Sequence, residues 1–520
     1  MLWHTAGSNP FAYHVCNLAL HLIAAFLVVL LLQEFGLRFA WLGGILFAVH
    51  PLTVESVAWI SELKNTLALP LILLAAIAFL KWDRRRSAPW WTLSVLAFSA
   101  AMLAKSVVAP LPAWLLLYLW WRHQKLGRRD WLATLPFWIV SLGLSAVTVH
   151  FQLHRAMQSD VVPEYALASR LEGAGFALVF YVGKTVWPLG LTPMYPTWNL
   201  SPVSASALFP WLTCAAAFAI GWRHRATWGR HLNFLLASFI LFLTPVLGLI
   251  GMSFHRVAWV SDHFVYFALV AAVAALVAMA NRAPVRFRFA ILSDGAALAL
   301  TGAAVSHTYA GIFYDPVNFY SYAIAHSPDA WLAENDLGVT LESQGTPSEA
   351  KLHFKRAESI KPNSSLVHFD LGNCEAALGE LDDAGIEYET ALHLRPSYAA
   401  AADNLGNALS QQGRYTKAAD AYYVAIAANP RQPEYYSNLG VALAKQQQFA
   451  SASDAFENAV RLAPQNPLLR RNLANAYLAA GKVAQAIAEY HETLRLNPND
   501  SIAARGLRYA LNLPLKSEPK

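Results

Sequence analysis

The sequence predicts an all-α protein in two parts, a polytopic membrane helical domain followed by an α-solenoid of repeated helix pairs. Three observations support this fold class. Hydrophobic residues make up 56% of the 520 residues and charged residues only 14%, which is far from the average of soluble domains. The net charge is +11 up to residue 313 and −5 from residue 314 onward. The second part repeats with a period of 34 residues. Lipid is therefore the expected solvent of the first part, and water that of the second.

Residues 1–313 are expected to form about ten membrane helices, because a crossing takes roughly 20 mostly apolar residues. Suitable segments lie at 13–33, 39–58, 66–82, 131–151, 205–222, 231–251, 262–280 and 290–311. The segment 91–121 is too long for one upright crossing at about 1.5 Å per residue. It contains Lys105 and the sequence Ala-Pro-Leu-Pro at 109–112. We expect it to cross twice, with a turn near Lys105.

Basic residues predict the orientation, because Lys and Arg collect in short cytoplasmic loops. If 91–121 crosses twice and 171–187 does not fully cross, 15 of the first part's 21 Lys and Arg are cytoplasmic. The basic loops are 81–86, 122–129, 223–230 and 281–288. The outer face then carries the residues before Tyr13, the loops 50–65, 152–204 and 253–263, the turn at Lys105, and everything after residue 313.

The second part resembles the tetratricopeptide repeat (TPR). Pro recurs at 328, 362, 396, 430, 464 and 498, and Leu at 337, 371, 405, 439, 473 and 507. Small residues stand at Ala350, Ala384, Ala418, Ala452 and Ala486, each followed four positions later by an aromatic residue. Such spacing lets two helices pack closely, with the aromatic ring filling the gap. After a connector at 314–330, five repeats are expected at 331–364, 365–398, 399–432, 433–466 and 467–500, then a capping helix and tail at 501–520.

The resemblance implies a concave groove that binds an extended protein or peptide segment. Four asparagines on the first helices of the repeats are candidates to clamp a bound backbone: Asn404, Asn407, Asn438 and Asn472. The alternative is ordinary polarity on a helix surface.

Polar residues interrupt the apolar first part at HPLTVESVAWISELKNTLAL, residues 50–69. Ionisable groups at membrane depth are costly and often mark a functional site or a watery cavity. We expect a short amphipathic helix from Thr53 to Lys64, with Glu55 and Glu62 on one face toward an outer cavity. His50 and Glu55 would then act near a reacting sugar or phosphate. The alternative is a solvated extracytoplasmic loop.

Further polar residues lie in predicted apolar surroundings. Lys105 needs an anionic partner, either a lipid-linked phosphate or a carboxylate such as Glu55 or Asp262. Asp262 and His263 begin a helix, where Asp262 could cap it or both could bind a divalent cation, although two ligands specify no metal. A polar seam against neighbouring helices is expected from three residues on one helix face: His14, Asn17 and His21.

Several classes of protein are disfavoured. The sequence has no phosphate-binding glycine loop, zincin motif or nucleophile elbow, which argues against cytosolic ATP-driven chemistry. It shows no inverted repeat of the kind typical of secondary transporters. Its three cysteines, Cys16, Cys214 and Cys374, are too far apart to indicate a disulfide framework or a zinc site. No nucleic acid partner is expected.

Together, NPFAYHVCNLALHL (9–22), the 50–69 stretch, SDHFVYFAL (261–269) and the repeats resemble the transmembrane and TPR O-mannosyltransferases and their bacterial relatives. These are membrane glycosyltransferases of the GT-C type. The resemblance implies transfer of a mannose-like sugar from a polyprenyl-phosphate donor to protein hydroxyls, at the periplasmic face of a bacterial inner membrane. In this hypothesis His50 and Glu55 are catalytic, Lys105 and Lys64 bind the donor phosphate, Asp262 and His263 orient the site, and the TPR groove binds the acceptor.

The sequence departs from that family in one respect. Members carry acidic catalytic residues in the first outer loop, after a first span, whereas the first acidic residue here is Glu34. His263 stands where many relatives have Arg. We therefore expect either a chain that lacks its N-terminal span or an inactive relative. The alternative function is a non-catalytic, membrane-anchored TPR scaffold for envelope protein assembly.

Overall fold

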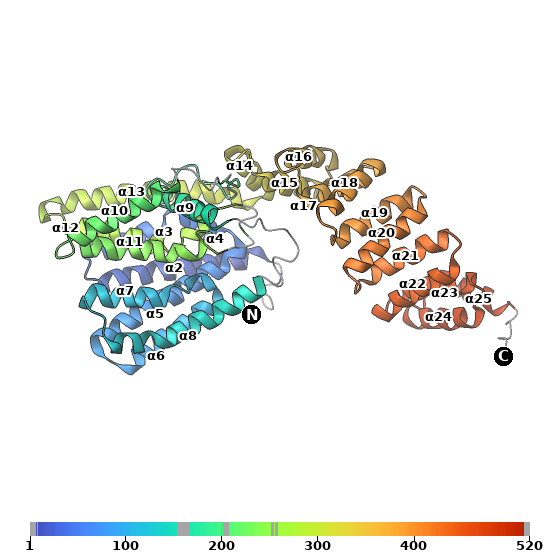
Figure 1. The fold of residues 1–520 in the computed structure, drawn as a ribbon, viewed down its shortest axis with the longest axis horizontal. Helices are drawn as coiled ribbons and strands as arrows, with labels where there is room; N and C mark the ends of the chain where they lie inside the picture. Colours follow the sequence, from blue (N-terminus) through green and yellow to red (C-terminus); the bar gives the residue numbers. More distant parts are fainter. Residues whose placement is uncertain are drawn as a thin grey trace. The chain divides into compact units, whose positions relative to one another are not determined.

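A computed structural model describes residues 7, 9–152, 166–198, 200, 207–250, 254 and 258–513. The omitted parts of the expected outer loops 152–204 and 253–263, and the tail 514–520, lie outside the described residues. The chain divides into two compact units, Met1–Ala333 (unit 1) and Glu334–Lys520 (unit 2), each coloured by sequence in Figure 1.

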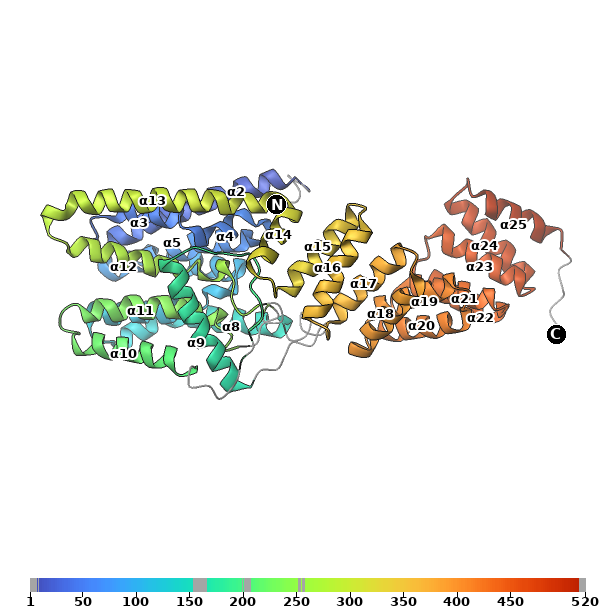
Figure 2. The ribbon, with the colours of Figure 1, turned by 90° about the horizontal axis from the view of Figure 1, so that it is seen from above.

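Unit 1 is built from helices of very different lengths. Its α-helices are α2 (Pro10–Glu34), α3 (Ala40–Ala48), α4 (Val54–Ala58), α5 (Leu63–Arg85), α6 (Ala88–Ala104), α7 (Leu111–His123), α8 (Arg128–Phe151), α9 (Leu167–Val186), α10 (Phe209–Arg223), α11 (Gly229–Leu243), α12 (Leu269–Arg282), α13 (Arg288–Gly311) and α14 (Pro316–His326). Short 3-10 turns include η1 (Pro51–Thr53), η2 (Ile60–Glu62), η3 (Ser106–Val108), η6 (Thr244–Val246), η8 (Asp262–Val265), η9 (Val285–Phe287) and η10 (Ile312–Tyr314). Helices α5, α6 and α8 pack side by side, and α10 packs on α11 (Figures 1 and 2).

Fewer helices are long enough to span a membrane than the ten expected. Within the described residues, five are long and apolar enough to cross, at Pro10–Glu34, Ile60–Arg85, Arg128–Phe151, Gly229–Val246 and Val285–Tyr314. The count becomes six if α3 and the η1–α4 segment, bent by 56°, form one broken span. The expected spans 205–222 and 262–280 overlap α10 and α12, of 15 and 14 residues, which are shorter than the roughly 20 residues a crossing takes.

One local prediction for unit 1 is confirmed, and a second holds in part. Helix α6 ends at Ala104 and α7 begins at Leu111, so the long segment 91–121 does divide at Lys105. Asn17 and His21 form the predicted polar seam: Asn17 accepts a hydrogen bond from Thr66 Oγ1 (2.7 Å), and His21 Nδ1 lies 2.8 Å from the Tyr266 hydroxyl. His14, the third member, is exposed.

The 50–69 stretch differs from its prediction. No continuous helix runs from Thr53 to Lys64, because the chain is extended at Trp59 (ψ 116°) between α4 and η2. Glu55 and Glu62 are 0% and 4% exposed. Neither carboxylate therefore faces the open cavity, or the solvent, that the sequence predicts. The segment is packed against α2, α5, α13 and η8. Both the amphipathic helix and the solvated loop were therefore wrong, since the carboxylates point into the protein.

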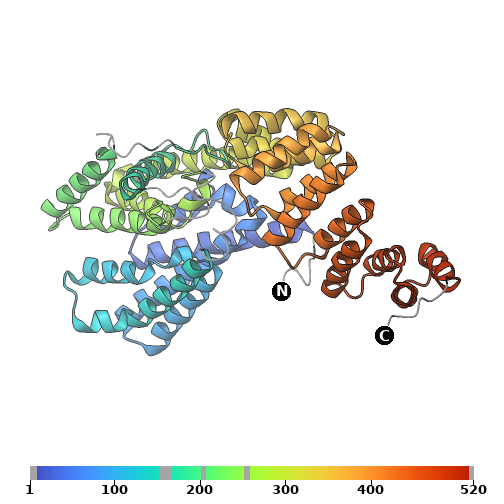
Figure 3. The same cartoon turned by 45° about the vertical axis from the view of Figure 1, so that its right-hand side comes forward.

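Unit 2 follows the predicted repeat. The first helices of the pairs begin 34 residues apart: α15 (Trp331–Ser343), α17 (Ser365–Ala377), α19 (Ala399–Gln411), α21 (Pro433–Lys445) and α23 (Pro467–Ala479). The second helices are α16 (Pro347–Ile360), α18 (Leu381–Leu394), α20 (Tyr415–Ala428), α22 (Phe449–Leu462) and α24 (Val483–Leu496), and α25 (Ser501–Leu511) is the expected capping helix. Figure 3 shows these pairs following one another along the unit.

Glycine and aromatic residues set the spacing within each pair. Gly406 in α19 faces the Tyr422 ring of α20 so closely that a Cβ atom there would lie 2.5 Å from the ring. Gly372 and Gly440 stand in the same relation to Tyr388 and Phe456. The repeated spacing of small and aromatic residues therefore fixes how closely paired helices approach.

Candidate functional site

Glu55 lies at the centre of a buried hydrogen-bonded cluster in unit 1. Its carboxylate accepts bonds from Ser261 Oγ (3.0 and 3.1 Å) and from the His263 backbone N–H (2.8 Å). His263 Nδ1 lies 2.8 Å from Glu55 Oε1 and 2.7 Å from Ser261 Oγ. Tyr181 holds the Ser261 backbone, accepting its N–H (3.2 Å) and donating to its carbonyl (3.3 Å). The structure thus joins two predicted site residues, Glu55 and His263, that lie 208 positions apart.

Asp262 lies beside this cluster but makes different contacts. It caps no helix; its carboxylate accepts hydrogen bonds from the hydroxyls of Tyr195 (2.9 Å) and Tyr309 (3.1 Å). Burial, reinforced by the neighbouring Glu55 carboxylate, raises the pKa of Asp262 above its usual range. The capping alternative is therefore wrong, and the surroundings of this carboxyl favour its protonated form.

Lys105 pairs with Glu62, and not with Glu55 or Asp262. Its Nζ lies 3.3 Å from Glu62 Oε2, and Lys64 Nζ lies 3.3 Å from the other oxygen. Burial lowers the pKa of the Lys105 ammonium, while the Glu62 and Glu55 carboxylates act in the opposite direction. The two lysines assigned to a phosphate are therefore brought together, within electrostatic range of the Glu55 cluster.

His50 is not part of the Glu55 cluster. Its Nε2 lies 3.1 Å from the Thr185 carbonyl, and its Nδ1 accepts the Leu52 backbone N–H (3.2 Å) at the start of η1. Because both ring nitrogens are engaged there, the proposed His50–Glu55 catalytic pair is not assembled in this structure.

Sequence reasoning missed several members of these clusters. Ser261 is adjacent to Asp262 and could have been included by proximity, and Glu62 was recognised as anomalous but given no partner. Tyr195 and Tyr309 lie 67 and 47 positions from Asp262. No local signal marks them, because only the tertiary fold brings them to the carboxylate.

The asparagines of unit 2 make hydrogen bonds both between neighbouring repeats and within one repeat. Asn404 donates to Asn373 Oδ1 (2.7 Å), and Asn407 accepts the Tyr422 hydroxyl (2.8 Å). A shallow hollow of about 250 Å³ lies between α17, α18 and α19. Its lining is Asn373, Ala376, Tyr388, Asn404, Asn407, Ala408 and Gln411. Two of the four predicted groove asparagines therefore share one hollow.

The other two groove asparagines lie farther along the solenoid. Asn438 donates to Asp403 Oδ1 (2.9 Å), and Asn472 is partly exposed on α23. Neither lines the hollow near Asn404.

Metal-ligating side chains gather elsewhere than Asp262 and His263. Within the described residues, two groups of at least three such side chains could share an ion, and both lie in unit 2. One is Glu358, His368 and Glu387; the other is Glu375, Glu380 and Asp383. Among the residues that the structure describes, Asp262 and His263 do not meet a third such side chain at one point, although Glu55 contacts His263.

Comparison with known proteins identifies the repeats. A tetratricopeptide repeat family model matches residues 443–511, and a second matches 369–433 and 404–467. No curated protein matches the chain. Similar solved structures include MamA from Desulfovibrio magneticus RS-1 (21% identity, TM-score 0.31, covering 33% of this chain and 97% of that one) and YrrB, a TPR protein with an unusual peptide-binding site (16%, 0.34, 36% and 97%). Another is a thermophilic TPR protein from Thermus thermophilus (25%, 0.28, 35% and 100%).

Unit 2 therefore contains TPR repeats, a class of domain that binds peptides or proteins.

Proposed function

We propose that this chain is a membrane glycosyltransferase that transfers a mannose-like sugar from a polyprenyl-phosphate donor to hydroxyls of a protein bound by its TPR repeats. One observation carries the proposal: acidic and basic side chains gather in the apolar unit 1. The Glu55–Ser261–His263 cluster and the Lys105–Glu62–Lys64 cluster lie within electrostatic range of each other. Buried ionisable groups of this kind are expensive and tend to mark functional sites.

The chemistry of transfer assigns a task to each cluster. The bond from the sugar's anomeric carbon to the donor phosphate breaks, and its electron pair leaves with the phosphate. A bond forms between that carbon and the acceptor oxygen, and the hydroxyl proton passes to a carboxylate, for which we assign Glu55. Lys105 and Lys64 stabilise the departing phosphate. Asp262 and His263 orient this site.

The proposed location follows from the charge distribution. Basic loops at the opposite face would place Glu55, Lys105 and the repeats on the periplasmic face of a bacterial inner membrane. Gln344 is exposed in unit 2. A Gln344→Cys variant should react with an impermeant thiol reagent in spheroplasts above the background of the parent chain, in which Cys16 and Cys214 are partly exposed and Cys374 is buried. Labelling only after lysis would overturn this orientation.

Activity is tested by transfer of labelled mannose from polyprenyl-phosphate mannose to a protein acceptor in detergent. We expect Lys105→Gln and Glu55→Gln to reduce transfer at least tenfold. Lys81→Gln is the matched control, because Lys81 lies over the Trp90 ring, about 25 Å along α5 from Lys64. Asn404→Ala should raise the KM for the protein acceptor and leave the KM for the donor unchanged.

A membrane-anchored scaffold is the second candidate, favoured by one feature of the same cluster. Glu55 is fully buried, and both of its oxygens already accept hydrogen bonds from Ser261 and His263. A purely structural cluster would have this form. If the purified chain binds a protein through its repeats but transfers no sugar, the scaffold is supported.

A further inference from the structure

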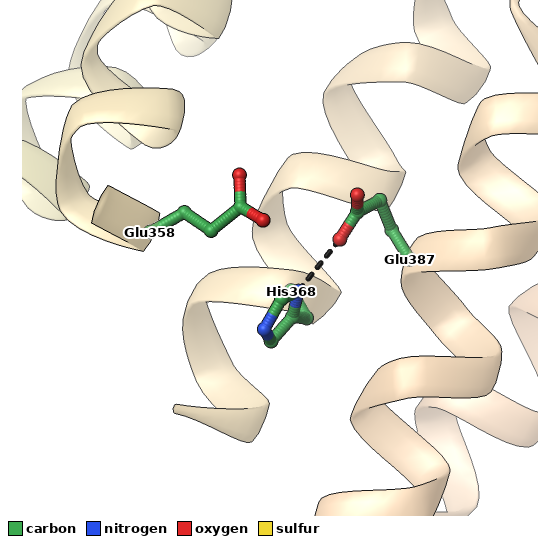
Figure 4. A group of neighbouring side chains, drawn as sticks. All are labelled: Glu358, His368 and Glu387. Carbon is green, nitrogen blue, oxygen red and sulfur yellow. Dashed lines mark hydrogen bonds and ion pairs between the residues drawn. The ribbon is translucent and has the colours of Figure 1, made fainter. Parts of the chain in front are cut away.

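Three potential metal ligands from consecutive helices of unit 2 meet at one point. Glu358 comes from α16, His368 from α17 and Glu387 from α18 (Figure 4). One ligand atom from each lies within 4.8 Å of the other two. His368 is buried and both glutamates are partly buried. The site lies entirely within unit 2 and shares no residue with the clusters of unit 1.

A hydrogen bond outside this group of three shows which ring nitrogen of His368 carries a proton. Its Nε2 lies 2.8 Å from the Pro362 carbonyl oxygen, which can only accept, so Nε2 carries a proton. The lone pair of a neutral ring is then on Nδ1, and Nδ1 lies 2.6 Å from Glu387 Oε2. Two acceptors at this distance repel each other unless a cation, either a proton or a metal ion, lies between them.

The position of Glu358 favours a metal ion. In Figure 4 the carboxylate of Glu358 points toward His368 and Glu387, but only the His368–Glu387 contact is a hydrogen bond. A proton on His368 pairs with one carboxylate only, whereas a divalent cation would interact with both. The Pro362 carbonyl then takes the role that orients a metal-bound histidine through its other ring nitrogen.

We propose that Glu358, His368 and Glu387 bind a divalent transition-metal ion, for which Zn²⁺ is the test ion. One imidazole and two carboxylates suit Zn²⁺ and its neighbours better than Mg²⁺ or Ca²⁺, which prefer oxygen ligands alone. Bonds of about 2.1 Å at tetrahedral angles place ligands about 3.4 Å apart. His368 and Glu387 must therefore separate slightly and Glu358 must approach, which side-chain rotations achieve, and a fourth position remains for water.

The neighbouring repeat supplies a matched control. His353 Nδ1 lies 2.8 Å from Glu334 Oε2, a contact of the same kind, but Arg356 Nε lies 3.0 Å from the other Glu334 oxygen. Glu334 is thus already paired with a guanidinium, whose positive charge repels a metal ion. The other acidic group, with Glu375, is likewise neutralised by Lys351 (3.0 Å).

The test uses the full chain in detergent, stripped of metal and titrated with Zn²⁺ against a chromophoric chelator. We expect one equivalent to bind and His368→Gln and Glu358→Gln each to weaken binding about tenfold or more, while His353→Gln binds as the parent does. Glu358→Gln keeps the His368–Glu387 contact, so its circular dichroism melt should match the parent in the absence of metal. Co²⁺ at the same site should give the visible absorption of a four-coordinate centre.

Two results would overturn the proposal: no stoichiometric Zn²⁺ binding, or equal binding by the parent, His368→Gln and Glu358→Gln. Either would assign the contact to a protonated histidine paired with Glu387. Since binding is read without any sugar transfer, this outcome is independent of the proposed function.

Discussion

Replacing Gly406 by Ala tests whether the aromatic ring opposite each repeat glycine fixes the spacing of the helix pair. The added Cβ would lie 2.5 Å from Tyr422 Cε1 and 2.8 Å from two further ring atoms. The ring is 2% exposed, and its hydroxyl donates to Asn407 Oδ1 (2.8 Å). Because the ring is held at both ends, the helices rather than the ring must move apart.

Two opposing effects determine the size of the change. Forcing an extra carbon into a packed core costs about 1–3 kcal/mol, whereas Gly→Ala inside a helix gains about 1 kcal/mol from helix propensity. We expect Gly406→Ala to lower the free energy of unfolding by about 0–2 kcal/mol. Gly385→Ala is the matched control, because the nearest atom to its Cβ is Leu405 Cδ1 at 4.0 Å; it should gain about 0.5–1 kcal/mol.

Amide hydrogen exchange in the full chain measures the local free energy of opening, on α19 and α20 for Gly406→Ala and on α18 for Gly385→Ala. The Tyr422→Ala background completes a double-mutant cycle. Without the ring, Gly406→Ala should stabilise α19 and α20 by about as much as Gly385→Ala stabilises α18. If Gly406→Ala raises the opening free energy even with Tyr422 present, the close contact does not exist and the reasoning fails.

Three further predictions concern charged groups. Glu55→Ala should lower the melting temperature in detergent, because it leaves the buried backbone N–H of His263 without its acceptor, at a cost of about 1–3 kcal/mol; an unchanged melt would show that the cluster is not structural. Burial raises the pKa of Asp370 to about 6, and the Asn335 hydrogen bond acts in the opposite direction. The folded state therefore binds more protons than the unfolded state between about pH 4 and 6, so the free energy of unfolding falls as pH rises. Amide exchange of the parent at about pH 5 and 7 measures this loss of stability, and Asp370→Asn should remove up to about 1–2 kcal/mol of it. Asp500 caps α25 by accepting two backbone N–H bonds of 3.0 Å; Asp500→Ala should speed exchange of α25 amides by about fivefold, a loss of about 1 kcal/mol, and leave α19 unchanged.

The sequence predicts unit 2 well because its information is local and repeated. The interval of 34 residues recurs in the starts of α15, α17, α19, α21 and α23, and the positions of Gly406 and Tyr422 within one repeat already imply their contact. In unit 1 the sequence marks the break at Lys105 through its prolines. It gives no such mark for the interruption at Trp59, since residues 52–69 contain neither Pro nor Gly.

The candidate site was predictable only in part, because its contacts join distant segments. Polar residues in an apolar region identify Glu55, Lys105 and Asp262 as anomalies, since each carries a high cost of burial. Their partners depend on the packing of helices. Glu55 contacts Ser261, 206 positions away in the sequence, and Lys105 contacts Glu62, 43 positions away. Composition does not distinguish these pairings from the ones expected.

The pairing of charges separates Asp262 from three other buried carboxylates of unit 1. Glu62 contacts the ammonium groups of Lys64 and Lys105, Asp83 contacts Arg86 (3.1 Å) and Arg122 (3.3 Å), and Glu55 contacts His263. Asp262 accepts only tyrosine hydroxyls among the hydrogen bonds and ion pairs of the described residues. Tyrosine hydroxyls carry no charge to offset burial, so burial and the neighbouring Glu55 carboxylate raise the pKa of Asp262 and favour its protonated form. A protonated acid cannot accept the proton of an acceptor hydroxyl, which is why Glu55 takes that role in the proposed transfer and Asp262 an orienting one.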